Sequence, residues 1–159
     1  MPKTVLVVDD EQDIVDLLRY NFTKGGYRVL TAGNGEEALE KVKSKPDLIL
    51  LDVMMPKMDG HEVVRHLKRN VSTANIPIIF LTAKGMELDE VVGLELGAED
   101  YIVKPISMAR LMARVKTVLR RERSIQRNAF RNLLPFLLVV FAVGMARDDI
   151  PIGSDRSSV

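Results

Sequence analysis

The sequence predicts an α/β fold in which a five-stranded parallel sheet is covered by helices on both faces. Through residue 119, five short apolar runs alternate strictly with five amphipathic segments, as in a chain that repeats a strand and a crossover helix. The apolar runs are nearly continuous, as expected for strands that are buried on both faces. The 159 residues, 47% of them hydrophobic, suffice for one ordinary domain plus a short extension.

The expected strands are short, and most of the apolar runs stop abruptly at a polar side chain. The first run ends at Asp9–Asp10, the third at Asp52, the fourth at Thr82 and the fifth at Lys104. Turn formers and amphipathic segments separate the runs, which is typical of strands in a parallel sheet. The strands are predicted at residues 4–8, 27–31, 47–51, 77–81 and 101–103.

The expected helices carry apolar side chains at spacings of three and four residues. Gly25–Gly26 ends the first helix and Pro46 ends the second, because neither residue type continues a helix well. The last helix is the clearest, since its apolar stripe runs from Met108 to Leu119 with basic residues outside it. The helices are predicted near residues 14–22, 35–45, 63–67, 87–96 and 108–119.

The polar residues at the strand ends are the candidates for chemistry. The carboxyl ends of parallel strands meet at one edge of an open sheet, near the point where the strand order reverses. The sequence therefore predicts that one site brings together Asp9, Asp10, Asp52, Thr82 and Lys104. Each carboxylate alone has a plain structural interpretation as a strand end, a helix cap or a turn residue. Together with Thr82 and Lys104, they form a reactive set.

That set predicts a magnesium-assisted phosphoryl acceptor. Three clustered carboxylates repel one another unless a counter-charge is present, and Mg²⁺ prefers carboxylate, water and phosphate oxygens. The sequence has no cysteine and only two histidines, so it offers no ligand set suited to zinc. With Mg²⁺ bound, Asp52 could attack phosphorus as an ionised nucleophile while Lys104 and Thr82 hold the developing phosphoryl oxygens.

Five motifs, in this order, resemble the receiver domain of bacterial two-component response regulators, and most closely that of the OmpR/PhoB group. They are VLVVDDE (5–11), LILLDVMMPKMDG (48–60), PIIFLTA (77–83), GAEDYIVKP (97–105) and the final amphipathic helix. The resemblance covers residues 3–121. It implies a flavodoxin-like sheet of order 2-1-3-4-5 and a cytoplasmic signalling domain that a sensor histidine kinase phosphorylates. Such a domain catalyses only its own phosphorylation and dephosphorylation, and is not a turnover enzyme.

The resemblance assigns a role to each residue of the acidic site. Asp52 matches the phosphoacceptor and also contributes to the metal site. Asp10 matches the direct metal ligand, and Asp9 matches the acid that reaches the metal mainly through water. The backbone carbonyl of Met54 matches the third protein ligand. The implied cofactor is therefore Mg²⁺, held by these four residues.

The resemblance also implies a switch beside the acidic site. Thr82 and Tyr101 match the switch pair of the family. When Asp52 is phosphorylated, the hydroxyl of Thr82 moves toward the phosphoryl group and Tyr101 turns inward. A plain helix cap for Thr82 and a plain core residue for Tyr101 are the alternatives. Lys104 matches the invariant lysine of the family, and its bond to Pro105 is expected to be cis.

A dimer interface is implied as well. Receivers of the OmpR/PhoB group pair through the fourth helix, the fifth strand and the fifth helix, using intermolecular ion pairs. The matching pairs here are Asp100 with Arg114, Glu95 with Lys116, and Glu90 with Arg110. Both signs of the third pair are reversed relative to the family pattern, so this pair would survive as its mirror image. We expect a homodimer that disfavours pairing with standard family members.

The composition of the chain changes near residue 120. Residues 1–119 hold 16 basic and 18 acidic residues, whereas residues 120–159 hold 7 basic residues, all of them Arg, and 4 acidic ones. We therefore predict a receiver domain at residues 1–121 and an atypical basic and apolar tail at residues 122–159. The tail is too short for the winged-helix domain of an OmpR/PhoB protein, so direct DNA binding by this chain is not expected.

The tail contains an apolar run of 14 residues, at positions 133–146, that includes Pro135. This run is shorter than the roughly 20 residues that span a bilayer, so membrane contact is not favoured. An interfacial helix, a packing segment and an out-of-frame remnant of a longer gene are the alternatives. The change from Lys to Arg slightly favours the remnant. Residues 147–159 are expected to be disordered.

Other functions stay open on the residues alone. The chain could be a transcriptional regulator that lacks its DNA-binding domain. A flavodoxin-like cofactor binder shares the topology, but the acidic residues 9–11 would repel a phosphate where its phosphate loop should be. An aspartyl-phosphate hydrolase of the haloacid dehalogenase type needs a second Asp two residues after its nucleophile, and Met54 follows Asp52 there. His61 and His66 are interpreted as surface or packing residues.

Overall fold

The structure is a computed structural model that describes residues 1–83 and 87–145, without the side chains of residues 87–90, 144 and 145. The chain divides into two compact units, Met1–Leu119 and Arg120–Val159. The strands are β1 (Thr4–Val8), β2 (Arg28–Ala32), β3 (Leu48–Asp52), β4 (Ile78–Thr82) and β5 (Asp100–Val103). The helices are α1 (Gln12–Lys24), α2 (Gly35–Lys41), the 3₁₀ helix η1 (Val42–Ser44), α3 (Gly60–Arg69), α4 (Glu87–Glu95) and α5 (Met108–Met145).

The first unit contains a five-stranded parallel sheet of order β2-β1-β3-β4-β5, which confirms the predicted order. β1 pairs with β2 on one side and with β3 on the other. The direction in which successive strands are added therefore reverses beside β1. Since ligands bind outside the carboxyl ends of the strands at such a point, the ends of β1 and β3 define the place for a site.

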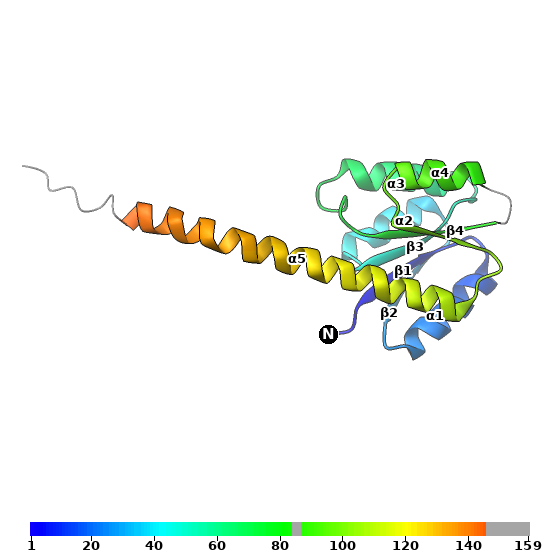
Figure 1. Cartoon of the computed structure of the whole chain (residues 1–159). Helices are drawn as coiled ribbons and strands as arrows, with labels where there is room; N and C mark the ends of the chain where they lie inside the picture. Colours follow the sequence, from blue (N-terminus) through cyan, green and yellow to red (C-terminus); the bar gives the residue numbers. More distant parts are fainter. Residues whose placement is uncertain (84–86, 146–159) are drawn as a thin grey trace, which may run out of the picture. The chain divides into compact units, whose positions relative to one another are not determined.

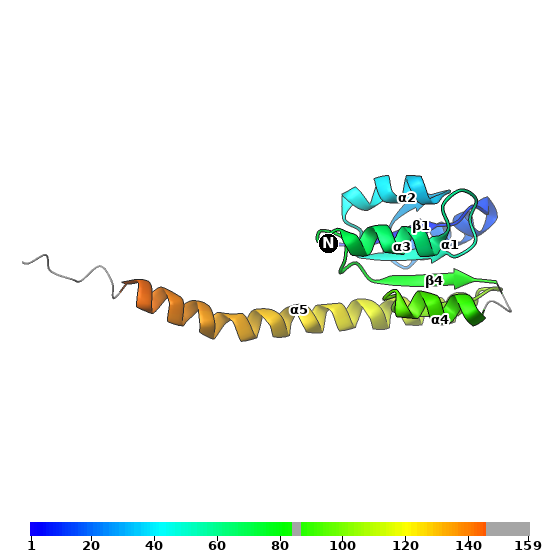
Figure 2. The same cartoon turned by 90° about the horizontal axis from the view of Figure 1, so that it is seen from above.

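Two layers of helices cover the sheet and bury its two faces. One core cluster joins the sheet to α2 and α3 through residues that include Ala38, Val63 and Val64. The other joins it to α1 and the start of α5 through Phe22 and Leu111. Figure 1 shows α2, α3 and α4 on one face of the sheet and α1 on the other. Seen from above, α2, α3 and α4 lie side by side across their face (Figure 2).

Most of the observed strand boundaries differ from the predicted ones by one residue. β1 has its predicted limits, but β2, β3 and β4 each begin and end one residue later than predicted. Asp52 pairs with Leu81 and Thr82 pairs with Val103 within the sheet. A polar residue at a strand end keeps its backbone pairing, because the ladder uses only main-chain groups. Asp52 and Thr82 are therefore held rigidly, as the last residues of their strands.

The segment between β3 and α3 passes very close to the end of β3. The side chain of Asp59 accepts a 2.9 Å hydrogen bond from the backbone of Glu62 and so caps α3. A Cβ atom at Gly60 would collide with the backbone oxygen of Asp52. Only glycine lets α3 begin this close to the end of β3, and the backbone N–H of Gly60 donates to the carbonyl of Val53 across the same contact.

Helix α5 continues well beyond the predicted end at residue 119. Residues 120–134 contain neither Gly nor Pro, so no strong helix breaker stops it, and Pro135 lies inside the helix. In the second unit, apolar side chains such as Phe130, Leu133 and Phe136 are exposed. Within the described residues, no helix has the length and apolarity needed to span a bilayer. Residues 147–159, predicted to be disordered, lie outside the described residues.

Candidate functional site

Three carboxylates converge at the carboxyl edge of the sheet. One oxygen from each of Asp9, Asp10 and Asp52 lies within 4.8 Å of the others. Asp9 and Asp52 are buried, with 1% and 4% of their surface exposed, whereas Asp10 is exposed. The convergence of the three acids follows from the pairing of β1 with β3. The cluster is thus closed toward the protein and open toward solvent on the side of Asp10.

Lys104 supplies the positive charge of this site. Its ammonium nitrogen lies 2.9 Å from Oδ2 of Asp9 and 3.5 Å from Oδ2 of Asp52. A third carboxylate, that of Glu11, lies 3.5 Å from the same nitrogen. The Lys104–Pro105 peptide bond is cis, as predicted. Lys104 comes from the end of β5, 95 residues away from Asp9, so only the folded sheet brings the two together.

Backbone groups orient the two buried acids. The backbone N–H of Glu11 donates a 2.9 Å hydrogen bond to Oδ1 of Asp9. The backbone N–H of Met54 donates a 3.3 Å hydrogen bond to Oδ1 of Asp52. In both cases the donor follows the acid by two residues, which is a local turn pattern that Asp favours. In each acid the second oxygen, Oδ2, is the one that faces the ammonium of Lys104.

Burial and neighbouring charges perturb the two central groups. Burial and the charge of Asp9 outweigh the attraction of Lys104 and raise the pKa of Asp52 to about 7. For Lys104, burial favours the neutral amine. The hydrogen bond to Asp9 and the charges of Asp52, Asp9 and Glu11 oppose this effect more strongly, so the pKa of Lys104 lies above its usual value. Among the described residues, three clustered carboxylates face one ammonium, so the negative charge of the site exceeds its positive charge.

The donor set fits a hard divalent cation. The ligand atoms that converge are carboxylate oxygens, which Mg²⁺ prefers. Burial and the neighbouring charge of Asp9 raise the pKa of Asp52, and a bound cation would offset both effects. The exposed position of Asp10 leaves room for water and for phosphate oxygens, which Mg²⁺ usually retains in its coordination shell. The side chain of Met54 is exposed. Met54 comes two residues after Asp52, the last residue of β3.

The two predicted switch residues are both buried. Thr82 is 2% exposed at the end of β4, and its hydroxyl donates a 3.4 Å hydrogen bond to the carbonyl of Ala83. Tyr101 is 9% exposed, and its hydroxyl oxygen lies 3.4 Å from Nε2 of His61. The ring of Tyr101 is tilted against that of Phe80, with 5.1 Å between the centroids. Tyr101 therefore points into the protein.

Comparison with known proteins assigns the chain to a family. The family model described as "Response regulator receiver domain" matches residues 5–116. The chain belongs to the response-regulator receiver family. This receiver is 56% identical over 122 residues to the alkaline phosphatase synthesis transcriptional regulatory protein PhoP of Bacillus subtilis (strain 168), which agrees with the predicted resemblance to the OmpR/PhoB group. The match covers 76% of this chain and 50% of PhoP, so the chain spans about half the length of that relative.

Solved structures support the same assignment. A putative response regulator from Chloroflexus aurantiacus has 36% identity and a TM-score of 0.72, and the match covers 76% of this chain and 99% of that one. The chemotaxis protein CheY4 of Vibrio cholerae has 32% identity and a TM-score of 0.70, and the match covers 74% and 99% of the two chains. Receivers are phosphorylation-controlled signalling domains, so the two rival classes, the cofactor binder and the hydrolase, are set aside.

The residues predicted for a dimer face of this receiver are mostly exposed. Arg114 forms a 3.1 Å ion pair with Asp100 within the same chain, whereas the resemblance implies that the two pair across a dimer. Glu95, Arg110 and Lys116 are exposed. The side chain of Glu90 lies outside the described residues. The face therefore presents charged groups to solvent. One of the three predicted pairs, Asp100 with Arg114, is already formed within a single chain.

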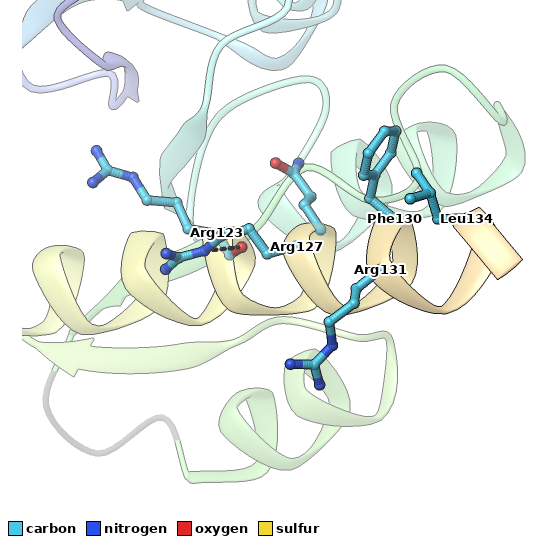
Figure 3. A pocket seen from close by; sticks show the side chains of 6 residues that line it. Arg123, Arg127, Phe130, Arg131 and Leu134 are labelled. Atoms are coloured by element: carbon cyan, nitrogen blue, oxygen red, sulfur yellow. Dashed lines mark hydrogen bonds between the residues drawn. The ribbon is translucent and has the colours of Figure 1, made fainter.

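A shallow hollow lies along the second unit, lined by Arg123, Gln126, Arg127, Phe130, Arg131 and Leu134 (Figure 3). All six side chains come from α5, and no second element within residues 1–83 and 87–145 lines the hollow. Nε of Arg127 donates a 3.3 Å hydrogen bond to the backbone carbonyl of Arg123, and this bond stays within the helix. The hollow brings no acid or nucleophile together, so it is not a candidate for the chemistry.

Two neighbours of the site were missed by the sequence argument. Glu11 contacts Lys104. Its position close after the end of the first strand is a signal that could have placed it in the predicted site. His61 was interpreted as a surface or packing residue, and it is indeed 7% exposed and packed. No sequence signal pointed to its contact with Tyr101, because the two residues are 40 positions apart. His66 is exposed.

Proposed function

We propose that this receiver accepts a phosphoryl group from a sensor histidine kinase onto Asp52, in a reaction that depends on Mg²⁺. The observation that carries the proposal is the cluster of three carboxylate oxygens within 4.8 Å of one another, faced by the ammonium of Lys104 at 3.5 Å from Asp52. A buried carboxylate at the rigid end of a strand, with a cation beside it, suits nucleophilic attack on a charged phosphoryl group.

The proposed reaction is an in-line transfer from a phosphohistidine. An oxygen of ionised Asp52 forms a bond to phosphorus, while the bond between phosphorus and the imidazole nitrogen breaks. The electron pair of that bond stays on the imidazole nitrogen. The ammonium of Lys104 and the hydroxyl of Thr82 stabilise the equatorial phosphoryl oxygens, where negative charge is spread in the transition state. Water then attacks the phosphorus of the aspartyl phosphate, the bond from phosphorus to the Asp52 oxygen breaks, and inorganic phosphate leaves as the free carboxylate returns. In this proposal the domain catalyses only these two reactions on itself.

We assign the metal site to Asp9, Asp10, Asp52 and the backbone carbonyl of Met54. Bound Mg²⁺ supplies the counter-charge that lets Asp52 stay ionised at neutral pH and neutralises charge on the phosphoryl oxygens. Asp52, whose pKa is about 7 beside two acids and one ammonium, gains the most from such a counter-charge. Asp10 offers an accessible carboxylate for direct binding, and buried Asp9 remains paired with Lys104.

We further propose that phosphorylation is transmitted through Thr82 and Tyr101 to the surface formed by α4, β5 and α5. The buried hydroxyl of Thr82 is at the end of β4, one strand away from Asp52. Tyr101 already points inward in this structure, and movement of the Thr82 hydroxyl toward the phosphoryl group gives the inward ring more space and so stabilises that orientation. The state of Tyr101 then controls dimerisation or the binding of a partner protein at that surface.

We propose that the reversed pair, Glu90 and Arg110, contributes to the choice of dimer partner. A mixed dimer with a standard family member would bring like charges together, which disfavours it. The test is the double charge reversal Glu90→Arg with Arg110→Glu, followed by measurement of heterodimer formation with a standard OmpR/PhoB receiver. The reversed variant should pair with that receiver more readily than the original chain does. Unchanged partner choice would contradict this part of the proposal.

The extent of the functional chain is part of the proposal. We assign residues 1–121 to the receiver and residues 122–159 to a basic and apolar tail, in a protein that acts in the cytoplasm. A second candidate function is a part in the regulation of transcription. The observation that favours it is the 56% identity over 122 residues to a transcriptional regulatory protein.

Phosphorylation by a small donor tests the central proposal. The full chain is incubated with acetyl phosphate and Mg²⁺, and its intact mass is then measured. We expect an adduct of about 80 Da, the mass that a phosphoryl group adds on forming the aspartyl phosphate. The adduct should be absent in Asp52→Asn and in the presence of a chelator. Asp47→Asn is a matched control, because Asp47 is also at a strand boundary but pairs with Lys3 instead. An adduct that persists in Asp52→Asn would refute the assignment.

A further inference from the structure

Tyr101 lies in a buried compartment built from three other elements. His61 of α3 is 7% exposed and Phe80 of β4 is fully buried. The imidazole ring of His61 meets the ring of Phe80 edge-on, with 5.4 Å between the centroids. The ring of Phe80 in turn meets that of Tyr101 at 5.1 Å. Gly93 of α4 lies against the rings of Tyr101 and Phe80.

The contact with Gly93 fits the inward orientation of Tyr101. A Cβ atom built at Gly93 would lie 2.5 Å from the hydroxyl oxygen of Tyr101 and 2.7 Å from Cε2 of its ring. These distances are far below van der Waals contact, so an alanine there and an inward Tyr101 cannot coexist without movement. The far end of the tyrosine side chain is the part that can move most easily. Glycine at position 93 therefore keeps this place open for Tyr101.

The polar end of Tyr101 meets a polar group in this compartment. Nε2 of His61 lies 3.4 Å from the hydroxyl oxygen, and both residues are buried. A buried hydroxyl or imidazole without a hydrogen-bond partner is costly, so this contact compensates part of the cost of turning Tyr101 inward. Either nitrogen tautomer of neutral His61 serves, since a hydroxyl can both donate and accept.

We propose that His61 is a positioning residue for the switch, which stabilises the inward orientation of Tyr101 through this hydrogen bond. The inference rests on the proposed switch role of Tyr101. Because the inward tyrosine and an occupied phosphoryl site favour each other in the proposed switch, a group that stabilises the inward tyrosine also favours occupation of that site, by at most the factor by which it shifts the tyrosine. His61 therefore sets how far this receiver is biased toward its activated conformation, from a position on α3 that does not belong to the acidic cluster.

The first measurement follows Tyr101 itself. The full chain, which has three tyrosines, is labelled with 3-fluorotyrosine. The resonance of Tyr101 is identified as the one that is missing in Tyr101→Phe. His61→Leu keeps a side chain of similar bulk but removes the hydrogen-bonding nitrogen, whereas His61→Gln restores a polar group. We expect the ¹⁹F resonance of Tyr101 to move toward its solvent-exposed position in His61→Leu and to return in His61→Gln. A resonance that is the same in all three proteins would overturn the inference.

The second measurement tests the link to the phosphoryl site. Beryllofluoride with Mg²⁺ serves as the probe, and its affinity is measured for wild type, His61→Leu, Tyr101→Phe and the double variant. Loss of one hydrogen bond should weaken binding about fivefold in His61→Leu. In the Tyr101→Phe background, which lacks the hydroxyl, His61→Leu should change nothing. Equal weakening in both backgrounds would indicate a merely structural role of His61 and would overturn the inference.

Gly93→Ala is an independent variant if His61→Leu folds poorly. It displaces the tyrosine sterically and leaves His61 in place, so the same outward shift of the Tyr101 resonance is expected. An unshifted resonance in Gly93→Ala would contradict the compartment itself. The acetyl phosphate adduct is also measured on every variant. If all variants form the adduct but the effect of His61→Leu on beryllofluoride affinity does not depend on Tyr101, only this inference is refuted. The lack of an adduct in the wild type refutes the proposed function instead.

Discussion

The ammonium of Lys104 lies closer to Asp9, at 2.9 Å, than to any other carboxylate of the site. Asp9 is 1% exposed, so this pair is shielded from solvent and its attraction is only weakly screened. The pairing leaves Asp52 less fully compensated, because the same nitrogen is 3.5 Å away from it. Among the described residues, Lys104 is the cation that faces these two buried acids, at unequal distances. Burial and the charge of Asp9 outweigh its attraction for Asp52, whose pKa is raised to about 7.

Replacement of Lys104 by Met should slow phosphorylation of Asp52 by acetyl phosphate about 100-fold, because a preorganised charge on the phosphoryl oxygens is lost. The rate is followed by intact mass at saturating Mg²⁺. Lys3→Met is the matched control, since it also removes an ammonium that pairs with an aspartate, but with Asp47 outside the acidic cluster. A Lys104→Met rate equal to that of the control would argue against the role of Lys104.

The stability of the metal-free protein should decrease as the pH rises from about 4 to about 7. The pKa of Asp52 is raised from 3.8 to about 7 in the folded chain, so in this range the folded state binds more protons than the unfolded state. Asp52→Asn removes this dependence and should raise the free energy of unfolding by up to about 4 kcal/mol at pH 8. Urea unfolding in the presence of a chelator, at pH 5 and pH 8, measures both quantities. A gain from Asp52→Asn that is equal at the two pH values would contradict the raised pKa.

Addition of Mg²⁺ at pH 8 should stabilise the folded chain, because the cation binds the native acidic cluster. At a concentration about 100 times its dissociation constant, the expected gain is about 2.7 kcal/mol. Asp10→Asn should require a higher Mg²⁺ concentration for the same gain, whereas Asp13→Asn, which changes an exposed acid at the start of α1, should not. Thermal unfolding titrated with Mg²⁺ provides the measurement. Identical titrations for the two variants would exclude Asp10 as a ligand.

The ion pair between Asp100 and Arg114 should contribute little to the stability of the monomer. The two side chains are 24% and 55% exposed, and exposed pairs are worth about 1 kcal/mol or less. If these residues pair across a dimer instead, Arg114→Ala should weaken dimerisation of the phosphorylated chain more than it weakens folding. Sedimentation equilibrium and urea unfolding of the same variant compare the two. Arg69→Ala, on exposed α3 surface, is the control that should affect neither.

Much of the fold could be predicted because each strand and helix has a local pattern. The buried run from Leu48 to Leu51 and the glycines that follow the helices mark their elements in the sequence itself. The last helix was predicted too short, because an amphipathic stripe marks only the part that packs on the sheet. Its continuation to Met145 is almost entirely exposed as far as Val143, so no packed apolar stripe marks it in the sequence. The strand ends were one residue early, because hydropathy does not register main-chain pairing by Asp52 or Thr82.

The candidate site was predictable in its members but not in its internal arrangement. That Asp9, Asp52 and Lys104 would meet follows from the topology of parallel strands. Which acid Lys104 prefers depends on distances of a few tenths of an ångström, and these are fixed by the packing of β5 against β4 and by the turn that orients Asp9. The contact of Tyr101 with His61 likewise depends on how α3 lies over the sheet.

The sequence by itself determined which side chains this receiver can use: three acids, a hydroxyl and an amine at the ends of apolar strands, since residue type and strand polarity are written in the chain. Only the tertiary structure decided which groups became buried and how they pair. Burial removes water from Asp52 and gives it a raised pKa, and the close approach of α4 at Gly93 brings Tyr101 to His61. Both effects depend on distances through space between residues far apart in the chain, and no local pattern encodes those distances.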